Sequence, residues 1–257
     1  MQQKKIVFLA SDCESSRWVY HALAGEFRFS AVLLEQPVSR KALFKRRMQR
    51  IGFFRVAGQA LFSLLVVPVL RRQAEARKQA LLREYELSGN DFPSDSIRLS
   101  SVNDRQCIES LQQIDPDIVV VNGTRIISRE VLGCCKAKFI NMHVGITPAY
   151  RGSHGGYWAV RNNDLGNFGT TIHLVDTGVD TGAVLKQVFT KPAKEDNFTT
   201  YPVLQTAIGI PALKEVLHSG INGVFSTIPV VGKGKMYYQP SVWAYFFGKP
   251  RQPETRV

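Results

Sequence analysis

The chain has 257 residues, enough for one large α/β domain, and its 44% apolar and 21% charged residues are ordinary for a soluble globular protein. Its four cysteines show no C-x-x-C spacing and Cys134 and Cys135 are adjacent, which argues against a disulfide-stapled secreted scaffold and for reduced thiols in the cytoplasm. The formal net charge is +12, but residues 40–83 alone hold 12 Lys/Arg against one acid, Glu75. The basic character therefore belongs to one segment, and the remainder is close to neutral.

A β-α-β unit is predicted near the start of the chain. The short apolar run over 5–10 is typical of a strand buried in a parallel sheet. Ser and Asp then precede a periodic apolar stretch, which predicts a helix, and a second strand over 29–37 closes at Pro37. The pattern G-x-G-x-x-G does not follow the first strand, so an ordinary dinucleotide site is not indicated.

Residues 38–87 interrupt this alternation with a basic start, an apolar centre and a basic end. Gly52, Gly58 and Pro68 predict two or three helices rather than one rod. The apolar centre also contains polar residues that argue against a membrane span, namely Arg55, Gln59 and Ser63. Two interpretations stay open: a helical insert that packs its apolar face on the domain, or a basic amphipathic surface for anionic lipid or another anionic partner.

The β/α alternation then resumes. Strands are predicted over 96–102, 116–123, 136–143, 168–176 and 182–190. Helices are predicted over 104–114, 128–135, 154–164 and 197–220, the last broken at Pro202 and Pro211. We expect an α/β fold: a Rossmann-like open, mostly parallel sheet with flanking helices, a basic helical insert and a short C-terminal hairpin. The predicted organisation is a domain over 1–220, with 38–87 as its insert, and a short extension over 221–257.

Ligands of such sheets bind outside the carboxyl ends of the strands, and one strand end carries Asn141 and His143. Residues i and i+2 of a strand point to the same face, so an amide and an imidazole project into one crevice. An amide can donate a hydrogen bond to an oxyanion, and a histidine can do the same or move a proton near neutral pH. The Gly/Pro-rich run that follows lets the backbone pass close to a ligand.

A second polar segment, "HLVDTGVDTGAV", places Asp176 and Asp180 around a Thr-Gly-Val turn. Such a loop can hold a carboxylate in the crevice as a base or as the group that orients a histidine; the alternative is that both aspartates only close Asx-turns. No His/Cys/Glu cluster has metal-ligand spacing, and G-x-S-x-G is absent from the sequence. We therefore predict neither a metal site nor a serine hydrolase.

Together, "NMHVGITPAYRG", "HGGYWAV" and "GTTIHLVDTGVDTG" resemble the formyltransferase catalytic domain, whose methionyl-tRNA, glycinamide ribonucleotide and sugar-nucleotide members use 10-formyltetrahydrofolate. The resemblance implies that Asn141, His143 and Asp180 are the catalytic residues. The stretch "VVVNGTRIIS" is similar to the folate-side loop, so the resemblance implies a cofactor-binding set of Gly123, Arg125, Ile127 and Asp176. One departure is "GIT" (145–147), where many members carry Ser-Leu-Leu.

The resemblance also implies direct transfer of the formyl group to an amine. The tail "GKGKMYYQPS" is similar to the C-terminal hairpin of sugar N-formyltransferases, which favours the amine of a nucleotide-linked amino sugar for surface polysaccharide. The residues expected on the acceptor side are Tyr150, Arg151, His154 and Tyr157. Only 75 residues follow Gly182, so the C-terminal β-barrel of methionyl-tRNA formyltransferases, and hence a nucleic acid partner, is not expected.

Two alternatives remain. One is a methionyl-tRNA formyltransferase-like enzyme in which the basic insert contacts phosphates. The other is a non-catalytic module that binds a membrane surface or a partner through 38–87. In either case we expect a cytoplasmic protein, with contact at the inner face of the membrane if the insert is a lipid-binding surface, and a homodimer is compatible with the sequence.

Overall fold

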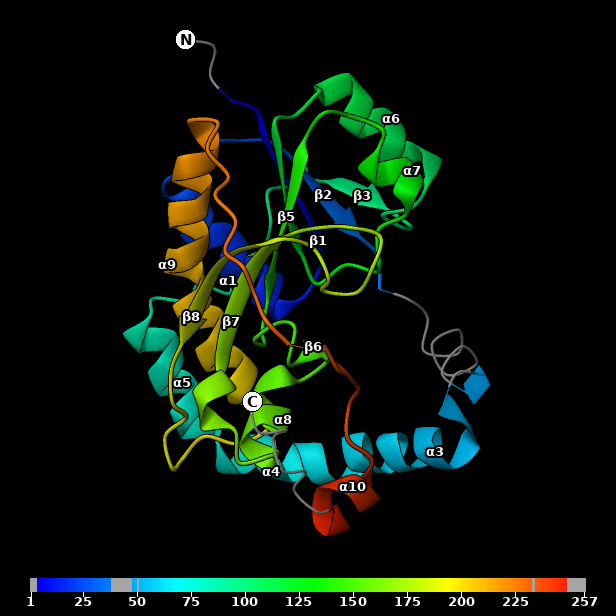
Figure 1. Cartoon of the computed structure of the whole chain (residues 1–257), viewed down its shortest axis with the longest axis vertical. Helices are drawn as coiled ribbons and strands as arrows, with labels where there is room; N and C mark the ends of the chain where they lie inside the picture. The colour runs from blue at the N-terminus through cyan, green and yellow to red at the C-terminus, as the bar shows by residue number, and fades with distance from the viewer. Residues whose placement is uncertain (1–3, 38–47, 50, 233, 249–257) are drawn as a thin grey trace.

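The computed structural model describes residues 4–37, 48–49, 51–232 and 234–248, and their central feature is one open sheet (Figure 1). Within these residues, seven strands are ordered β3-β2-β1-β4-β5-β7-β8. Their bounds are β1 (Ile6–Ser11), β2 (Phe29–Glu35), β3 (Ile97–Leu99), β4 (Ile118–Asn122), β5 (Lys138–His143), β7 (Gly169–Leu174) and β8 (Val184–Phe189). Two further strands, β6 (Arg151–Gly152) and β9 (Met236–Tyr237), form a separate small sheet.

The sheet is parallel from β3 to β5 and antiparallel at β7 and β8. The central strand β4, "IVVVN", is buried at every position because helices cover both faces of the sheet. Alternate residues of β1 enter the two cores: Phe8 packs on one side and Leu9 on the other. The predicted open, mostly parallel α/β sheet is thus confirmed.

Helices α1 (Glu14–Ala24) and α9 (Tyr201–Ile221) cover one face of the sheet, and α6 (Arg105–Ile114) and α7 (Arg129–Leu132) cover the other (Figure 1). Of the two predicted breaks in the last long helix, the one at Pro211 is wrong, because α9 runs on past it. Pro202 marks the start of α9, where the missing proline N–H costs little. Most of α9 is buried, so its packing outweighs the hydrogen bond that Pro211 cannot make.

The insert is helical, as predicted, but its breaks differ. Helix α3 (Phe53–Leu61) passes through a π-helical turn, η1 (Phe62–Val66), into α4 (Val67–Gln73), and α5 (Glu75–Glu84) follows. Gly58 lies within α3, and Pro68 lies directly after the π-helical turn, inside the continuous helix Phe53–Gln73. The predicted breaks at these two residues are therefore wrong. The part of the insert over 38–47 and residue 50 lies outside the described residues.

One face of the insert packs on the domain. Arg77 of α5 donates two hydrogen bonds to Asp196, at 3.0 and 3.3 Å, and the Asp196 side chain is fully buried. Asn197 Nδ2 donates to the carbonyl of Leu70 at 3.0 Å, and the Phe62 and Phe198 rings meet edge to face at 4.9 Å between centroids. On this face, therefore, the insert packs on the domain, as the first of the two interpretations of the insert predicted.

Helix α8 (Gly155–Arg161), the 3₁₀ turn η2 (Leu165–Asn167) and the short α10 (Val242–Phe247) complete the described elements. In the described part of the C-terminal extension, β9 pairs in parallel with β6 and does not fold back on its own segment, so the predicted hairpin is wrong. A hydrogen bond from Gln59 Nε2 to the carbonyl of Gln239, at 2.7 Å, instead ties the segment after β9 to α3.

Candidate active site

The carboxyl ends of β4 and β5 and the loop after β7 enclose a crevice of about 440 Å³. Every residue predicted to be catalytic or to bind the cofactor lines it, namely Asn141, His143, Asp180, Gly123, Arg125, Ile127 and Asp176. β4 and β5 are adjacent and parallel, so their carboxyl ends lie at the same edge of the sheet. β7 runs antiparallel to β5, and the loop after it folds back so that Asp180 reaches His143. Segments that are more than 50 residues apart in sequence, such as those of Gly123 and Asp180, therefore meet in the crevice.

Asp180 lies between two imidazole rings. Its Oδ2 is 3.4 Å from Nδ1 of His143, and its Oδ1 is 3.6 Å from Nε2 of His173. The N–H of Gly152 donates to Oδ2 at 2.8 Å. Burial alone would raise the pKa of Asp180, but the contacts with His173 and His143 and the Gly152 hydrogen bond together outweigh it and hold that pKa below its ordinary value. Asp180 is therefore a carboxylate with only 13% of its side chain exposed that stays ionised.

His143 presents one ring nitrogen to Asp180 and the other to the backbone. Its Nε2–H donates to the carbonyl of Tyr150 at 2.8 Å, which leaves Nδ1 facing the carboxylate. The side chain is buried, and burial lowers its pKa, although the Asp180 charge and the Tyr150 carbonyl act in the opposite direction. A neutral His143 with a basic Nδ1 beside a carboxylate is able to accept a proton near neutral pH.

His173 is a site residue that the sequence interpretation missed. It lies opposite Asn141 in the β5–β7 pair, and its Nδ1–H donates to the carbonyl of Leu174 at 2.8 Å. Its Nε2 then accepts a hydrogen bond from Asn141 Nδ2 at 3.1 Å, which fixes the rotation of the amide. His173 lies within the predicted strand 168–176, three residues before Asp176, and the strand pattern alone did not mark it as a site residue.

Gly145 is required by the position of the His143 ring. A Cβ at residue 145 would lie 2.6 Å from His143 Nε2 and 2.6 Å from the Tyr150 carbonyl oxygen. Thr171 holds the same loop by donating from Oγ1 to the Gly145 carbonyl at 2.8 Å and by accepting the Thr147 N–H at 3.1 Å. The Gly-Ile-Thr segment therefore suits this loop, whereas a serine at residue 145 would displace the histidine.

The other wall of the crevice is the loop after β4. Gly123 has a φ of +68°, and a Cβ there would lie 2.9 Å from Ser11 Oγ, so the turn requires glycine. The Arg125 guanidinium turns back into the fold, where its Nε is 3.1 Å from the Glu35 carboxylate. Asp176 Oδ1 accepts the Gly178 N–H at 3.0 Å and the Thr181 hydroxyl at 2.7 Å, so this aspartate closes a turn at the rim.

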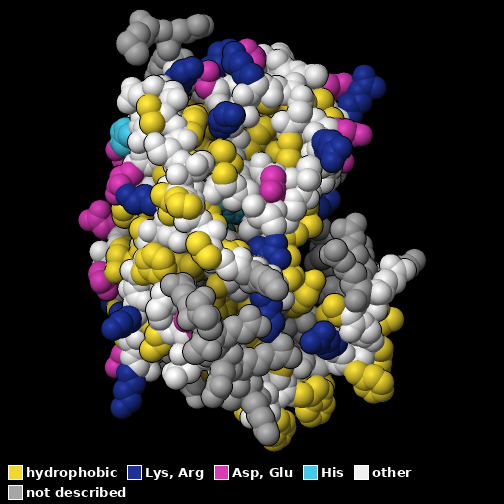
Figure 2. Space-filling view, viewed as in Figure 1, with side chains coloured by type: hydrophobic (Ala, Val, Ile, Leu, Met, Phe, Trp, Pro, Cys, Tyr) yellow, Lys and Arg dark blue, Asp and Glu magenta, His cyan; other side chains and the backbone are white. Residues whose placement is uncertain are grey.

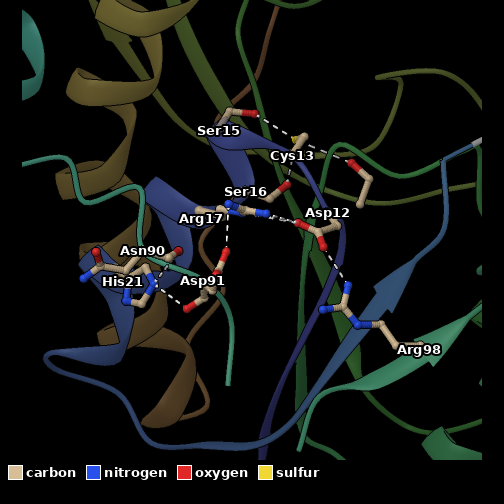
Figure 3. A network of polar contacts seen from close by, with 10 residues as sticks. Asp12, Cys13, Ser15, Ser16, Arg17, His21, Asn90, Asp91 and Arg98 are labelled. Carbon is tan, nitrogen blue, oxygen red and sulfur yellow. Dashed lines mark hydrogen bonds and ion pairs between the residues drawn. The ribbon is translucent and has the colours of Figure 1, made fainter. Parts of the chain in front are cut away.

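A polar network at the start of α1 supports the same wall (Figure 3). Asp12 accepts hydrogen bonds from Arg17 at 3.0 Å and Arg98 at 2.6 Å. The Cys13 thiol lies 3.2 Å from the hydroxyl of Ser16, which in turn accepts the side-chain N–H of Asn122 at the end of β4, at 2.9 Å. Burial alone would raise the pKa of Cys13, but contacts with neighbouring serine hydroxyls outweigh it and lower that pKa. These contacts fix the first turn of α1 against β4.

None of the residues predicted on the acceptor side lines the crevice. Tyr150 is buried, stacks on Tyr237 at 5.2 Å between centroids, and donates its hydroxyl to Asp164 at 2.9 Å. Tyr157 is also buried, and burial raises its pKa to about 12.

The other two predicted acceptor-side residues lie nearer the surface. The His154 ring packs 4.4 Å from the Phe198 ring, and His154 has a left-handed φ of +60° at the start of α8. Arg151 is half-buried, and its guanidinium donates to the Gly234 carbonyl at 3.4 Å. Packing therefore accounts for Tyr150, Tyr157 and His154, and Arg151 alone of the four presents a charge beside the C-terminal segment.

A second cavity, of about 420 Å³, lies beyond the small β6–β9 sheet. Gly152 lines the crevice and pairs with Tyr237, which lines this second cavity. Its walls combine cationic and aromatic side chains: Arg55, Arg161, Lys235, Trp158, Tyr237 and Tyr238. Such a lining suits an anionic ligand that also carries a flat ring. In the part of the chain that the structure describes, no group of three or more His, Cys, Asp or Glu is arranged to hold a metal ion.

Comparisons with known proteins agree with this geometry. Residues 59–202, more than half of the chain, match the formyl transferase family. A methionyl-tRNA formyltransferase of Chlorobium chlorochromatii is 32% identical over 119 residues, which cover 46% of this chain and 38% of that protein. The chain thus spans less than half the length of the curated relatives it matches.

Solved structures share the fold over most of the chain. A sugar N-formyltransferase from Shewanella superimposes with a TM-score of 0.57 at 16% identity, covering 91% of this chain and 76% of that one. A sugar 3N-formyltransferase solved in the presence of dTDP and 5-N-formyl-THF gives a TM-score of 0.54 at 14% identity, with coverage of 92% and 70%. The sheet, the crevice at its strand ends and the family match lead to one conclusion: this chain belongs to the formyl transferase family.

Proposed function

We propose that the protein is a cytoplasmic N-formyltransferase with 10-formyltetrahydrofolate as its formyl donor. The observation that carries the proposal is the arrangement of Asp180 between His143 and His173, with Asn141 hydrogen-bonded to His173, in one crevice. This arrangement can accept a proton and donate a hydrogen bond without a covalent intermediate. Family membership supports the same activity.

The loop after β4 fits the folate side of such a reaction. Gly123 leaves backbone groups uncovered at the wall of the crevice, and Ile126, 50% exposed, presents an apolar side chain to it. Backbone groups can hydrogen-bond the edge of a pterin while Ile126 contacts its face. We propose that Gly123, Arg125 and Ile127 hold the pterin through their backbone, with Asp176 shaping the rim. The bound donor supplies the electrophilic formyl carbon.

The residues then divide the chemical work. Asn141 uses one Nδ2–H on His173, which leaves the second for the negative charge that develops on the formyl oxygen. His143 Nδ1 accepts the proton that the amine loses as its bond to the formyl carbon forms, and Asp180 stabilises the imidazolium so formed. His143 would then return that proton to the donor nitrogen N10, which is released as tetrahydrofolate when its bond to the formyl carbon breaks. His173 acts through Asn141 and Asp180 as a positioning residue.

For the acceptor we propose the amine of a nucleotide-linked amino sugar. The second cavity supports this choice because three cations there can contact a diphosphate, and Trp158 or Tyr238 can stack on a base. Arg151, beside the same segment, is a further candidate for a phosphate contact. The fold neighbours named as sugar N-formyltransferases support the same class of acceptor. We further propose that residues 1–220 form the catalytic unit and that 221–257 complete the acceptor side.

A methionyl-tRNA acceptor is the second candidate. The specific observation in its favour is the 32% identity to a methionyl-tRNA formyltransferase over 119 residues. Exposed arginines of the insert, such as Arg71 and Arg72, would then contact the phosphates of the tRNA. Such contacts would make acceptor binding strongly dependent on salt concentration.

The test is a formyl-transfer assay with 10-formyltetrahydrofolate and a panel of dTDP-, GDP- and UDP-linked amino sugars, with methionyl-tRNA as the competing acceptor. We expect transfer to one nucleotide sugar, and we expect 5-formyltetrahydrofolate to raise the melting temperature, since a ligand that binds only the folded state stabilises it. Trp158→Ala should weaken acceptor binding and leave the folate-induced shift unchanged. No folate-induced shift and no transfer to any acceptor would exclude the proposal.

A further inference from the structure

The helix Phe53–Gln73 of the insert exposes several large apolar side chains. Along the helix Phe53–Gln73, the side chains of Phe54, Leu64, Leu65 and Val69 are 85%, 71%, 63% and 53% exposed. These residues recur at helical spacing, so they form one stripe, whereas Val56 and Phe62 point inward and are buried. An apolar stripe of this extent on a water-soluble protein usually marks an interaction site.

A second element extends the stripe. Helix α10, "VWAYFF", lies against α3, and its Trp243, Phe246 and Phe247 side chains are 58%, 59% and 78% exposed (Figure 1). Figure 2 shows hydrophobic side chains gathered at the lower right edge of the molecule, at the end where Figure 1 places α3 and α10. We call the exposed apolar residues of Phe53–Gln73 and of α10 the α3–α10 surface.

The two elements form a fixed surface. A Cβ at Gly58 would lie 2.8 Å from Ser241 Cβ and 3.2 Å from the Trp243 ring, so the start of α10 packs directly on the backbone of α3. Inward-facing Tyr245 of α10 contacts the Phe62 ring at 5.1 Å between centroids. Gln239 adds a hydrogen bond from its Nε2 to Ser63 Oγ at 2.6 Å. The aromatic side chains of α10 therefore project from a rigid support.

Cations accompany the apolar stripe at both ends. Arg55 near the start of the helix and Arg71 and Arg72 at its end are exposed. By sequence, six more Lys/Arg lie between residues 40 and 50, and the acid nearest to the helix is Glu75. A second copy of this face would bring the same cations together, which disfavours self-association. An apolar stripe with cations at its ends and a tryptophan at its side matches instead the interface of a bilayer with anionic headgroups.

The helix Phe53–Gln73 is also long and apolar enough to cross a membrane, by length and composition alone. Its contacts favour an in-plane orientation: 33% of the apolar window is buried against the rest of the protein, and Asn197 bonds the Leu70 carbonyl near its end. A spanning helix would have to give up this packing along its whole inner side.

We propose that the α3–α10 surface binds in the plane of an anionic membrane, with its apolar side chains in the headgroup–acyl boundary and Arg71 and Arg72 on the lipid phosphates. This docking is independent of the proposed reaction, because neither its apolar residues nor these two arginines line the crevice or the second cavity.

The test is co-sedimentation of the full chain with vesicles of phosphatidylcholine alone or mixed with phosphatidylglycerol. We expect binding to the mixed vesicles, little binding to the neutral ones, and loss of binding in about 0.5 M NaCl. Phe54→Ser with Leu64→Ser should weaken binding about tenfold or more, since affinity scales with buried apolar area. Arg71→Gln and Arg72→Gln should each weaken it about fivefold.

The matched control is Phe189→Ser with Val224→Ser, which removes two exposed apolar side chains, 55% and 53% exposed, outside the α3–α10 surface. It should bind vesicles like the parent chain, and melting temperatures should confirm that all variants are folded. Equal binding by the Phe54/Leu64 variant and the control would overturn the proposal. A parent chain that ignores vesicles but forms a dimer, lost on Phe54→Ser with Leu64→Ser, would also overturn it and assign the face to a second copy.

Discussion

The crevice and the α3–α10 surface are built on opposite principles. In the crevice, polar groups lie against one another: Asp180 accepts the Gly152 N–H and lies between two histidines, and Asn141 donates to His173. On the α3–α10 surface, large apolar groups such as Phe54 and Phe247 face outward with little cover. A site held by buried hydrogen bonds tolerates almost no substitution, whereas an exposed face contributes little to folding and is free to serve a partner.

The largest effect should follow the loss of a proposed catalytic group. His143→Ala should lower kcat by about 100- to 1,000-fold, because it removes the proposed proton acceptor. The measurement is formyl transfer to the acceptor found in the panel. His218→Ala, at an exposed histidine of α9, is the control and should retain activity. Near-normal turnover by His143→Ala would remove the crevice from the mechanism.

The next effect concerns the Arg77–Asp196 ion pair, which attaches the insert to the rest of the domain. Asp196→Ala should reduce the free energy of unfolding by about 3 kcal/mol, because it leaves Arg77 without its buried partner. This loss of stability is at the lower end of the range for breaking a buried ion pair, because the Arg77 side chain is 23% exposed to water. Urea denaturation measures the change, and Glu75→Ala at the exposed start of α5 is the control. Equal stability of the two variants would mean that the insert is not anchored through this pair.

A smaller effect should come from one added methyl group in the crevice. Gly145→Ala should cost about 2 kcal/mol of stability and reduce kcat, because the new Cβ would meet both His143 and the Tyr150 carbonyl. Gly166→Ala is the matched control, since a Cβ there has open space. If both variants are equally active, the position of His143 does not depend on the residue at 145.

The pH dependence of stability should be smaller still. Because the pKa of His143 is lowered in the folded state, the unfolded chain binds its proton first, and stability falls as the pH drops below about 6.5. The slope from this one proton is at most about 1.4 kcal/mol per pH unit. Asp180, whose pKa is also lowered, adds a loss below its ordinary value of 3.8. Urea titrations should show a shallower dependence between pH 5 and 7 in His143→Gln, and an unchanged slope would refute this assignment.

The smallest effect is expected on the exposed face. Leu64→Ser should change the free energy of unfolding by no more than about 0.5 kcal/mol, because the side chain is already 71% exposed. Phe62→Ala, two residues earlier and fully buried, should cost about 3–5 kcal/mol. Thermal or urea unfolding of this pair compares the two faces of one helix, and similar losses would contradict the burial described here.

The sequence predicts the crevice better than its surroundings, and the reason is physical. Asn141 and His143 lie at the carboxyl end of β5, next to the end of the parallel strand β4, so a local pattern is enough to place them. Asp180 follows the antiparallel strand β7, and the resemblance to formyltransferases, not the strand pattern, implied its role. His173 escaped because its role depends on the antiparallel pairing of β7 with β5, which no local pattern reports. Tyr150 suggested an acceptor contact, but its ring is buried against Tyr237 from the other end of the chain.

Long-range contacts also explain the wrong predictions for the insert and the tail. The amphipathic pattern of the insert predicts helices, but the predicted helix break at Gly58 was wrong. Gly58 lies inside the helix because Ser241 and Trp243 pack against the space that a side chain at residue 58 would occupy. The predicted C-terminal hairpin was wrong because β9 pairs in parallel with β6, a strand far away in the sequence. The α3–α10 surface joins residues from both halves of the chain, so neither segment alone indicates it.

The small β6–β9 sheet has a consequence for when the enzyme becomes competent. Gly152 donates its N–H to Asp180, and the strand that contains Gly152 is held by bonds from Arg151 N–H to the Lys235 carbonyl and from Ser153 N–H to the Tyr237 carbonyl, at 3.1 and 2.9 Å. A ribosome delivers residues 235–237 long after residue 180. We therefore expect the carboxylate to gain its final support only when that late segment docks, after the strands of the main sheet have been synthesised.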